Sequence, residues 1–284
     1  MLQSSSRALQ AKEACRHMLS LRPRSAADIW QDSTDNWSKL CVAMGCEKIS
    51  LPGAVVQTYQ INRSGSFYNS VFVQNPQSFE VKQVEGVFAE RNLPFSIILP
   101  SLKPYRELSN SLSEQRYLLA PPWSLMVHEA SIDRSSPDVR VEEIHSSKLA
   151  DWFELQDAFP HVESSRQARL EMIERVSRED STHLFLASLE GRSVGAGLLF
   201  IKDQVASIHM IATLPEFRRR QVATTVTLEA IGRARRDKAD LLWLRTRKGG
   251  TGEKVYTKIG FTSFSDILSY SRTPQCEDSN LPPR

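Results

Sequence analysis

Residues 205–221 read Val-Ala-Ser-Ile-His-Met-Ile-Ala-Thr-Leu-Pro-Glu-Phe-Arg-Arg-Arg-Gln, a β-rich run that stops at Pro215. Because proline cannot donate a hydrogen bond to a neighbouring strand, we expect the strand to end there. Beyond the arginines, small and aliphatic residues recur every three or four positions, as in an amphipathic helix. They are Val222, Ala223, Val226, Ala230, Ile231 and Ala234, with Glu229, Arg233 and Arg236 on the opposite face. The stretch therefore predicts a strand, a tight turn and a helix.

The predicted turn carries three arginines, Arg218, Arg219 and Arg220, at the start of the helix. The first turn of a helix has backbone N–H groups without intrahelical partners and a partial positive charge, so an anion is the expected ligand. A solvated basic face and a contact with an acidic partner are the alternatives. A nucleic-acid surface is not favoured, because no aromatic residues interleave with the arginines.

The turn and helix together resemble motif A of the GNAT superfamily of acyl-coenzyme A-dependent N-acyltransferases. That motif reads Arg or Gln, two variable residues, Gly, one variable residue, then Gly or Ala, and residues 218–223 agree at its first and last positions. Gln221 stands where the family has its first glycine. A residue in the first helical turn does not require a positive φ, so we expect Gln221 to keep the backbone site but to crowd the phosphates.

This resemblance implies that acetyl-coenzyme A binds at the turn. Its diphosphate would lie on the backbone at Arg218, Arg219, Arg220, Gln221, Val222, Ala223 and Thr224. Its pantetheine arm would follow the preceding strand, at Ile211, Ala212 and Thr213.

A second stretch, Gly252 followed by Val-Tyr-Thr-Lys-Ile-Gly-Phe at residues 255–261, resembles motif B of the same family. It follows an expected strand at 241–245, and the resemblance as a whole covers residues 138–272. In the family, the tyrosine of this motif protonates the departing thiolate, and the corresponding residue is Tyr256. The alternative is a core tyrosine whose hydroxyl has a local partner.

The general base is harder to identify. Many members of the family use a carboxylate on the strand before the turn, but the position four residues before Ile211 is Ser207. By strand alternation His209 lies on the same face as Ser207 and Ile211. An unperturbed histidine titrates near pH 6.5, which suits proton removal through a water. A hydrogen-bonded structural histidine is the alternative. A substrate amine with a depressed pKa, or a water chain to bulk solvent, would remove the need for a base.

The first half of the chain alternates strand and helix patterns. Strands are expected at 67–73, 93–100 and 122–128, and helices at 77–91 and 103–116. The order resembles the degenerate GNAT-like half of tandem-domain members, in which Asn-Xaa-Val and Leu-Pro strands recur. Since this half has no arginine turn and no Tyr-Gly-Phe string, we expect it to bind no coenzyme A.

The second half begins after a polar linker at 133–138. We expect a strand at 140–144, a helix ending at Pro160, another helix after residue 165, and a hairpin over 184–200 with its turn at 190–193. His161 and Glu163 lie in the region that closes over the substrate in related folds. They are candidate substrate contacts, with a plain surface loop as the alternative.

Composition indicates an ordinary globular protein. The chain has 284 residues, 40% of them hydrophobic, and a net charge of +3, too mild to indicate a nucleic-acid or membrane-surface partner. Four cysteines, Cys15, Cys41, Cys46 and Cys276, lack metal-ligand spacing, so we expect no metal and reduced thiols in a cytoplasmic-type compartment. The basic segment 1–29 superficially resembles a mitochondrial transit peptide, but a packed helix is preferred. No apolar stretch approaches the roughly 20 residues that span a bilayer.

The sequence thus predicts an α/β protein with a mixed sheet. A degenerate GNAT-like domain (30–132) precedes a catalytic GNAT domain (138–272) and a polar tail (273–284). The expected activity is transfer of an acetyl group from acetyl-coenzyme A to a primary amine, by direct attack in a ternary complex. The acceptor and the oligomeric state stay open. The alternative is a non-catalytic module with the same fold that senses acyl-coenzyme A or binds other proteins, motivated by Gln221 and the missing strand carboxylate.

Overall fold

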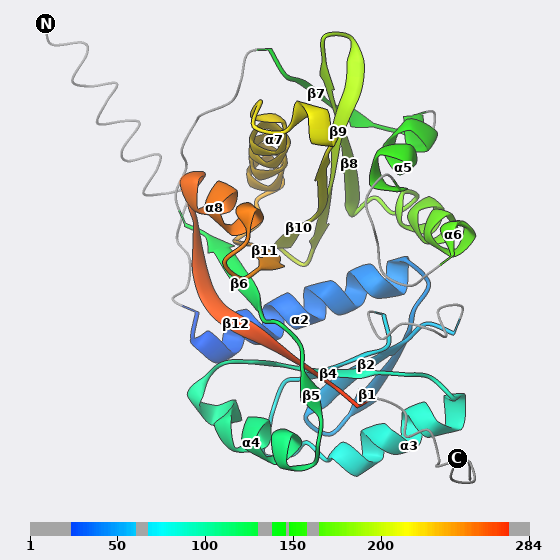
Figure 1. Cartoon of the computed structure of the whole chain (residues 1–284), viewed down its shortest axis with the longest axis vertical. Helices are drawn as coiled ribbons and strands as arrows, with labels where there is room; N and C mark the ends of the chain where they lie inside the picture. Colours follow the sequence, from blue (N-terminus) through cyan, green and yellow to red (C-terminus); the bar gives the residue numbers. More distant parts are fainter. Residues whose placement is uncertain (1–23, 61–67, 130–137, 146–147, 158–164, 273–284) are drawn as a thin grey trace, which may run out of the picture.

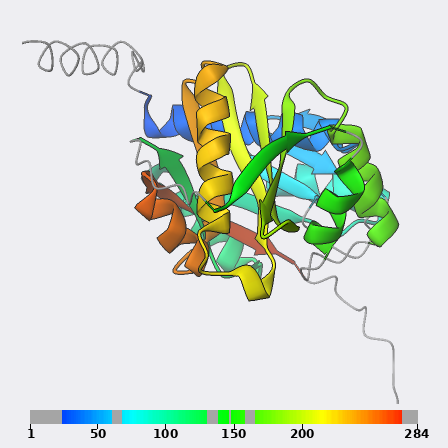
Figure 2. The ribbon, with the colours of Figure 1, turned by 90° about the horizontal axis from the view of Figure 1, so that it is seen from above.

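Within the described residues, twelve strands form one mixed sheet (Figure 1). The computed structural model describes residues 24–60, 68–129, 138–145, 148–157 and 165–272. Helices cover both faces of the sheet, as the view from above shows (Figure 2). The expected α/β class is therefore confirmed, whereas Cys15, Cys276, His161 and Glu163 lie outside the described residues.

The elements follow one another along the chain with short connections. The first half contributes α2 (Ala26–Ala43), β1 (Glu47–Leu51), β2 (Ala54–Thr58), β3 (Ser70–Val73), α3 (Val81–Arg91), β4 (Ser96–Pro100), η1 (Lys103–Tyr105), α4 (Arg106–Glu114), β5 (Leu118–Leu119) and β6 (Trp123–His128). The second half contributes β7 (Arg140–Ile144), α5 (Leu149–Asp157), α6 (Arg166–Val176), β8 (Thr182–Leu189), β9 (Arg192–Lys202), β10 (Val205–Thr213), η3 (Pro215–Phe217), α7 (Val222–Arg236), β11 (Leu241–Arg247), α8 (Thr251–Lys258) and β12 (Phe261–Ser271).

The strand order joins the two halves in one sheet. It runs β1-β2-β3-β4-β12-β6-β11-β10-β9-β8-β7, with β5 paired to β12. β6, from the first half, lies between β11 and β12 and is antiparallel to both. The C-terminal part of β12 pairs with a strand of the first half, because Ile267–Ser271 lie antiparallel to β4. The predicted linker lies almost wholly outside the described residues, and the division into two domains stays a prediction.

The β8–β9 hairpin turns through Glu190 and Gly191, whose φ angles are 55° and 76°. Two successive positive φ values are typical of the tight turns that match the twist of a hairpin. Side chains then alternate between the two faces of the sheet. Leu184 and Leu198 belong to the core shared with α2, α5 and α6, whereas Phe185 and Leu199 belong to the core under α7.

α7 has the predicted amphipathic face, because its small and aliphatic residues are buried against the sheet. Two glycines of β9 let it approach closely. A Cβ at Gly195 would overlap Val222 Cγ1 and lie 3.0 Å from the carbonyl oxygen of Ala212. A Cβ at Gly197 would lie 2.7 Å from Val226 Cγ1. The strand before the turn ends at Thr213, ahead of Pro215, as predicted.

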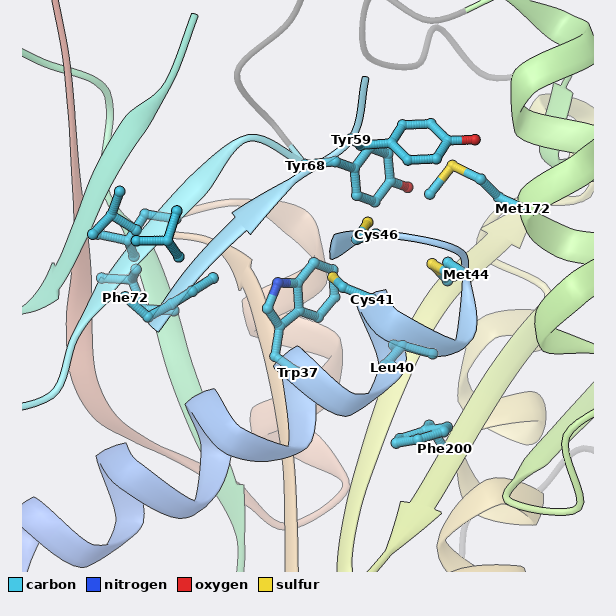
Figure 3. Packing of buried hydrophobic residues seen from close by; sticks show 14 of the residues in the cluster. Trp37, Leu40, Cys41, Met44, Cys46, Tyr59, Tyr68, Phe72, Met172 and Phe200 are labelled. Atoms are coloured by element: carbon cyan, nitrogen blue, oxygen red, sulfur yellow. The ribbon is translucent and has the colours of Figure 1, made fainter. Parts of the chain in front are cut away.

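The long helix α2 packs on the face of the sheet opposite α7 (Figures 1 and 2). It begins at Ala26, inside the predicted N-terminal basic segment, and a capping box between Ser25 and Asp28 fixes its first turn. Figure 3 shows Tyr59, Tyr68 and Met172 grouped above its C-terminal end, with Trp37 and Leu40 along the helix. α2 thus joins the apolar cores of the two halves.

Two further observations concern the cysteines and the length of the helices. Cys41 and Cys46 are buried free thiols, and burial raises the pKa of the Cys41 thiol well above its usual range. Among the described helices, none is long and apolar enough to cross a membrane.

Candidate active site

β10 and β11 separate in the middle of the sheet. Their parallel pairing covers Val205–Ile208 and Leu241–Leu244, although β10 continues to Thr213 and β11 to Arg247. Beyond Ile208, the edge of β10 that faces β11 has no partner among the described strands. By strand alternation, the backbone groups of Ile211 and Thr213 face this open edge, whereas those of Ala212 face β9, with which Ala212 pairs.

A β-bulge shapes the same stretch. The pairing of β10 with β9 shifts register between His209 and Ala212, and Met210 has a φ of 54°. Gln156 of α5 donates a hydrogen bond from Nε2 to the carbonyl oxygen of Met210 at 2.6 Å. Trp152, one turn earlier, donates from Nε1 to the carbonyl oxygen of Gly197 at 3.1 Å. α5 is thereby fixed against the strands at the point where they separate.

A cavity of about 330 Å³ lies beside this bulge. Both halves of the chain line it: Trp37 and Tyr68 from the first half, and His209, Arg245 and Tyr256 from the second. Its volume falls at the lower end of the range typical of small-molecule sites. The arrangement suits a small ligand next to the open edge of β10.

The start of α7 differs from the prediction in one respect. Gln221 is the N-cap residue, with φ 61° and ψ 10°, and Arg219 has a φ of 62°. The expectation that Gln221 needs no positive φ was wrong, because the chain enters the helix through a left-handed residue rather than through the first helical turn. Glycine adopts this conformation without steric cost, which gives a physical reason for the glycine of the motif.

The arginines are exposed, but they do not add three independent charges. Arg220 forms an ion pair with Glu190 in the hairpin turn, and its guanidinium lies 5.6 Å from the ring centroid of Phe217. The hydrogen bond and charge of Arg220 hold the pKa of the Glu190 carboxyl below its usual value. The backbone N–H groups of Val222, Ala223 and Thr224 remain as first-turn donors. An anion at this position would therefore rely mainly on the backbone.

Tyr256 lies on α8 and reaches the cavity wall. Gly252 allows the helix to lie close to β11, because a Cβ there would come within 2.5 Å of Thr246 Oγ1 and 3.4 Å of Tyr256 Cε2. The phenol ring also packs against Phe261, with a centroid distance of 5.9 Å. Burial raises the pKa of Tyr256 to about 12, so the hydroxyl keeps its proton at neutral pH.

His209 also lines the cavity, between the rings of Trp37 at 5.1 Å and Trp243 at 5.6 Å. Its Nε2 has no hydrogen-bond partner within the described part of the chain. Burial, assisted by the positive charge of Arg245, lowers the pKa of His209 to about 3. The expected value near 6.5 does not apply, and the imidazole is neutral and weakly basic.

Some residues of the cavity were not singled out from the sequence. Arg245 follows the apolar run Leu241–Leu244 inside β11, and a charge directly after four apolar residues was the available signal. Trp37 and Gln156 come from helices whose relation to β10 depends on long-range packing. The candidate contacts His161 and Glu163 cannot be related to the cavity, since they lie outside the described residues.

Comparison with known proteins concerns the fold and the second half of the chain. Residues 148–261 match the model of the acetyltransferase (GNAT) family. A GCN5-related N-acetyltransferase from Kribbella flavida is similar in structure, with a TM-score of 0.67 and 14% identity, covering 88% of this chain and 96% of that one. A GCN5-related N-acetyltransferase from Sphaerobacter thermophilus has a TM-score of 0.59 and 16% identity, covering 78% of this chain and 76% of that one. No curated protein matches the chain at a significant level.

At these identities the solved structures show a shared fold and nothing finer. The likeness to the Kribbella flavida structure extends over both halves of the chain, whereas the family match covers only the second. A degenerate GNAT-like origin of the first half stays a prediction. Residues 148–261 are thus similar to the acetyltransferase (GNAT) family, within a chain whose fold resembles that of the Kribbella flavida structure.

Proposed function

We propose that the protein is an acetyl-coenzyme A-dependent N-acetyltransferase that acetylates a primary amine by direct attack in a ternary complex. One observation carries the proposal: the open edge of β10 connects the start of α7 to a cavity whose wall includes Tyr256. A cofactor-binding end and an acceptor-binding end thus lie along one strand.

The described residues fit acetyl-coenzyme A in two respects. The first turn of α7 offers backbone N–H groups to a diphosphate, and the unpaired edge at Ile211 and Thr213 offers donors and acceptors to an amide-containing arm. The Gln221 side chain is the feature that fits less well, since glycine would leave more room. When bound, acetyl-coenzyme A supplies the thioester whose acetyl group is transferred.

Two side chains at the cavity have complementary proton chemistry. Tyr256, which keeps its proton at neutral pH, donates it to the departing thiolate. His209 is too weak a base to deprotonate an alkylammonium efficiently, because its pKa is about 3. The acceptor therefore loses its proton to solvent before it attacks, and backbone N–H groups of β10 stabilise the developing oxyanion.

Titration calorimetry with acetyl-coenzyme A, followed by thiol release on a panel of primary amines, tests the proposal. Binding together with amine-dependent thiol release supports the transferase. Binding without thiol release on any amine favours an acyl-coenzyme A sensor. Absence of both favours a protein-interaction module and overturns the proposal.

A further inference from the structure

The cavity beside β10 has a largely apolar wall to which both halves of the chain contribute aromatic side chains. Trp37, Tyr68 and Trp123 come from the first half, and Trp152 and Phe153 come from α5 in the second. Removal of apolar ligand surface from water against such a wall is favourable, roughly in proportion to the area buried. The volume of about 330 Å³ limits the occupant to a small molecule or one side chain.

Aliphatic side chains complete the wall where α2 meets α6. Leu40 and Met44 lie at the C-terminal end of α2, and Met172 and Ile173 lie on α6. All four are buried, and Met172 points from its helix toward Tyr68 and the end of α2 (Figure 3). Because methionine side chains are flexible and fill irregular gaps, this part of the wall can pack against apolar bodies of different shape.

The charged side chains of the described wall already interact with other groups of the protein. Asp157 forms ion pairs with Arg169 and with Arg166, both on α6. The guanidinium of Arg245 lies over Trp37, with its Cζ 3.9 Å from the ring centroid. Asp157 is the one carboxylate among the described lining residues, so a cationic group on a ligand body would leave water without gaining an unpaired carboxylate there.

We propose, on the basis of the function proposed above, that the acceptor is a small primary monoamine with an apolar body, aliphatic or aromatic. This body packs between the aromatic residues and Met172, and the single amine is the group that is acetylated. Diamines and polyamines are selected against, because their second ammonium would be buried without a partner. The same apolar surroundings disfavour the ammonium form of the reacting amine, which lowers the pKa of the amine and assists loss of its proton to solvent.

A binding assay without acetyl-coenzyme A tests the apolar body without any requirement for catalysis. The probes are n-hexylamine and 1,5-diaminopentane, which have the same chain length and differ by a terminal methyl or ammonium group. The readout is the change in tryptophan fluorescence, since Trp37, Trp123 and Trp152 line the cavity. We expect n-hexylamine to bind about tenfold more tightly or better, because its methyl group gains from burial whereas the second ammonium loses its hydration. Equal binding of the two probes, or tighter binding of the diamine, overturns the inference.

Variants of Met172 place the body in this cavity. Met172→Gln keeps the size of the side chain but makes it polar, and should weaken n-hexylamine binding about threefold or more. Met172→Leu, which stays apolar, is the matched control and should keep both the affinity and the preference over the diamine. A folded Met172→Gln protein that binds n-hexylamine as tightly as the original overturns the placement. If that variant does not fold, the comparison of the two probes on the unmodified protein still decides the class of body.

An activity comparison separates this inference from the proposed function. With acetyl-coenzyme A present, n-hexylamine and phenethylamine should each be acetylated with a kcat/KM about tenfold or more above that of 1,5-diaminopentane. Acetylation that favours the diamine overturns the inference but leaves the transferase standing. Preferential binding of n-hexylamine without acetylation of any amine overturns the transferase but leaves the apolar binding site.

Discussion

Gln221 has a left-handed backbone conformation at the entry to α7, with a φ of 61°. For an L-residue this conformation costs roughly 1–2 kcal/mol, a cost that glycine avoids. Gln221→Gly should therefore raise the free energy of unfolding by roughly 1 kcal/mol. It should also tighten acetyl-coenzyme A binding, because the side chain no longer crowds the phosphates. Chemical denaturation and calorimetry measure the two effects.

Lys238 provides the matched control for Gln221. It has a φ of 58° and is exposed just beyond the C-terminal end of α7, remote from the predicted phosphate site. Lys238→Gly should give a similar gain in stability with no change in affinity for acetyl-coenzyme A. If Gln221→Gly weakens binding instead, the glutamine side chain contributes a contact to the phosphates.

His209 gives a pH dependence of stability with a definite sign. Its pKa in the folded protein is about 3, below the ordinary value of 6.5, so between these values the unfolded chain binds more protons. The contribution to stability is complete above pH 6.5 and is lost as the pH falls toward 3, by at most about 1.4 kcal/mol per pH unit. Denaturation between pH 4 and pH 7 should show a shallower dependence for His209→Gln. The exposed residue His145 is the control, and an unchanged slope in His209→Gln would count against burial of a neutral imidazole.

The close packing of α7 on β9 fixes the position of the first turn of this helix. Gly195→Ala would press a Cβ against Val222 and the carbonyl oxygen of Ala212. Overpacking of this kind costs typically 1–3 kcal/mol, and we also expect weaker acetyl-coenzyme A binding because the first turn of α7 shifts. Thermal unfolding and calorimetry check both.

Gly86 in α3 is the corresponding control for Gly195, since a Cβ there meets nothing within 4 Å. Gly86→Ala should stabilise the protein by roughly 0.5–1 kcal/mol, the usual gain inside a helix. A Gly195→Ala protein as stable as the original would contradict the close packing of α7 on β9.

Local signals predicted these elements well. Pro215 stops β10, the three- and four-residue spacing gives α7, and Glu190-Gly191 gives the hairpin turn. The φ of Gln221 was missed because the pattern alone does not locate the helix start to one residue. The lowered pKa of His209 was also missed. It depends on Trp37 and Arg245, which are distant in sequence and come together only in the fold.

In the whole molecule, the order of the strands in the sheet could not be predicted from the sequence. The strand pattern of residues 122–128 was recognised, but no local feature indicates that β6 lies between β11 and β12. That placement brings Trp123 to Arg247 of β11, with Leu125 opposite Arg245, and the cavity then draws its walls from both halves. The cavity is consequently built from residues that a reading of either half alone does not connect.

The shared sheet predicts that the second half does not fold alone. Expressed as residues 138–284, it would expose the edges of β11 and β12 that β6 covers, together with the apolar face that α2 covers. We expect this fragment to lack a cooperative thermal transition and to regain one when it is expressed together with residues 1–137. A fragment that unfolds cooperatively by itself, near the melting temperature of the full chain, would contradict this account.

Tyr256 is the proposed proton donor in acetyl transfer, and turnover of Tyr256→Phe with a competent acceptor tests this role most directly. The change removes the hydroxyl but keeps the ring against Phe261. Tyr270→Phe is the control, because its hydroxyl is hydrogen-bonded to Ser109 at 2.6 Å and does not line the cavity. We predict that Tyr256→Phe lowers kcat by about 10²- to 10⁴-fold with unchanged acetyl-coenzyme A affinity, while Tyr270→Phe leaves kcat intact. A folded Tyr256→Phe protein with full turnover, under conditions in which chemistry limits the rate, would contradict the claim.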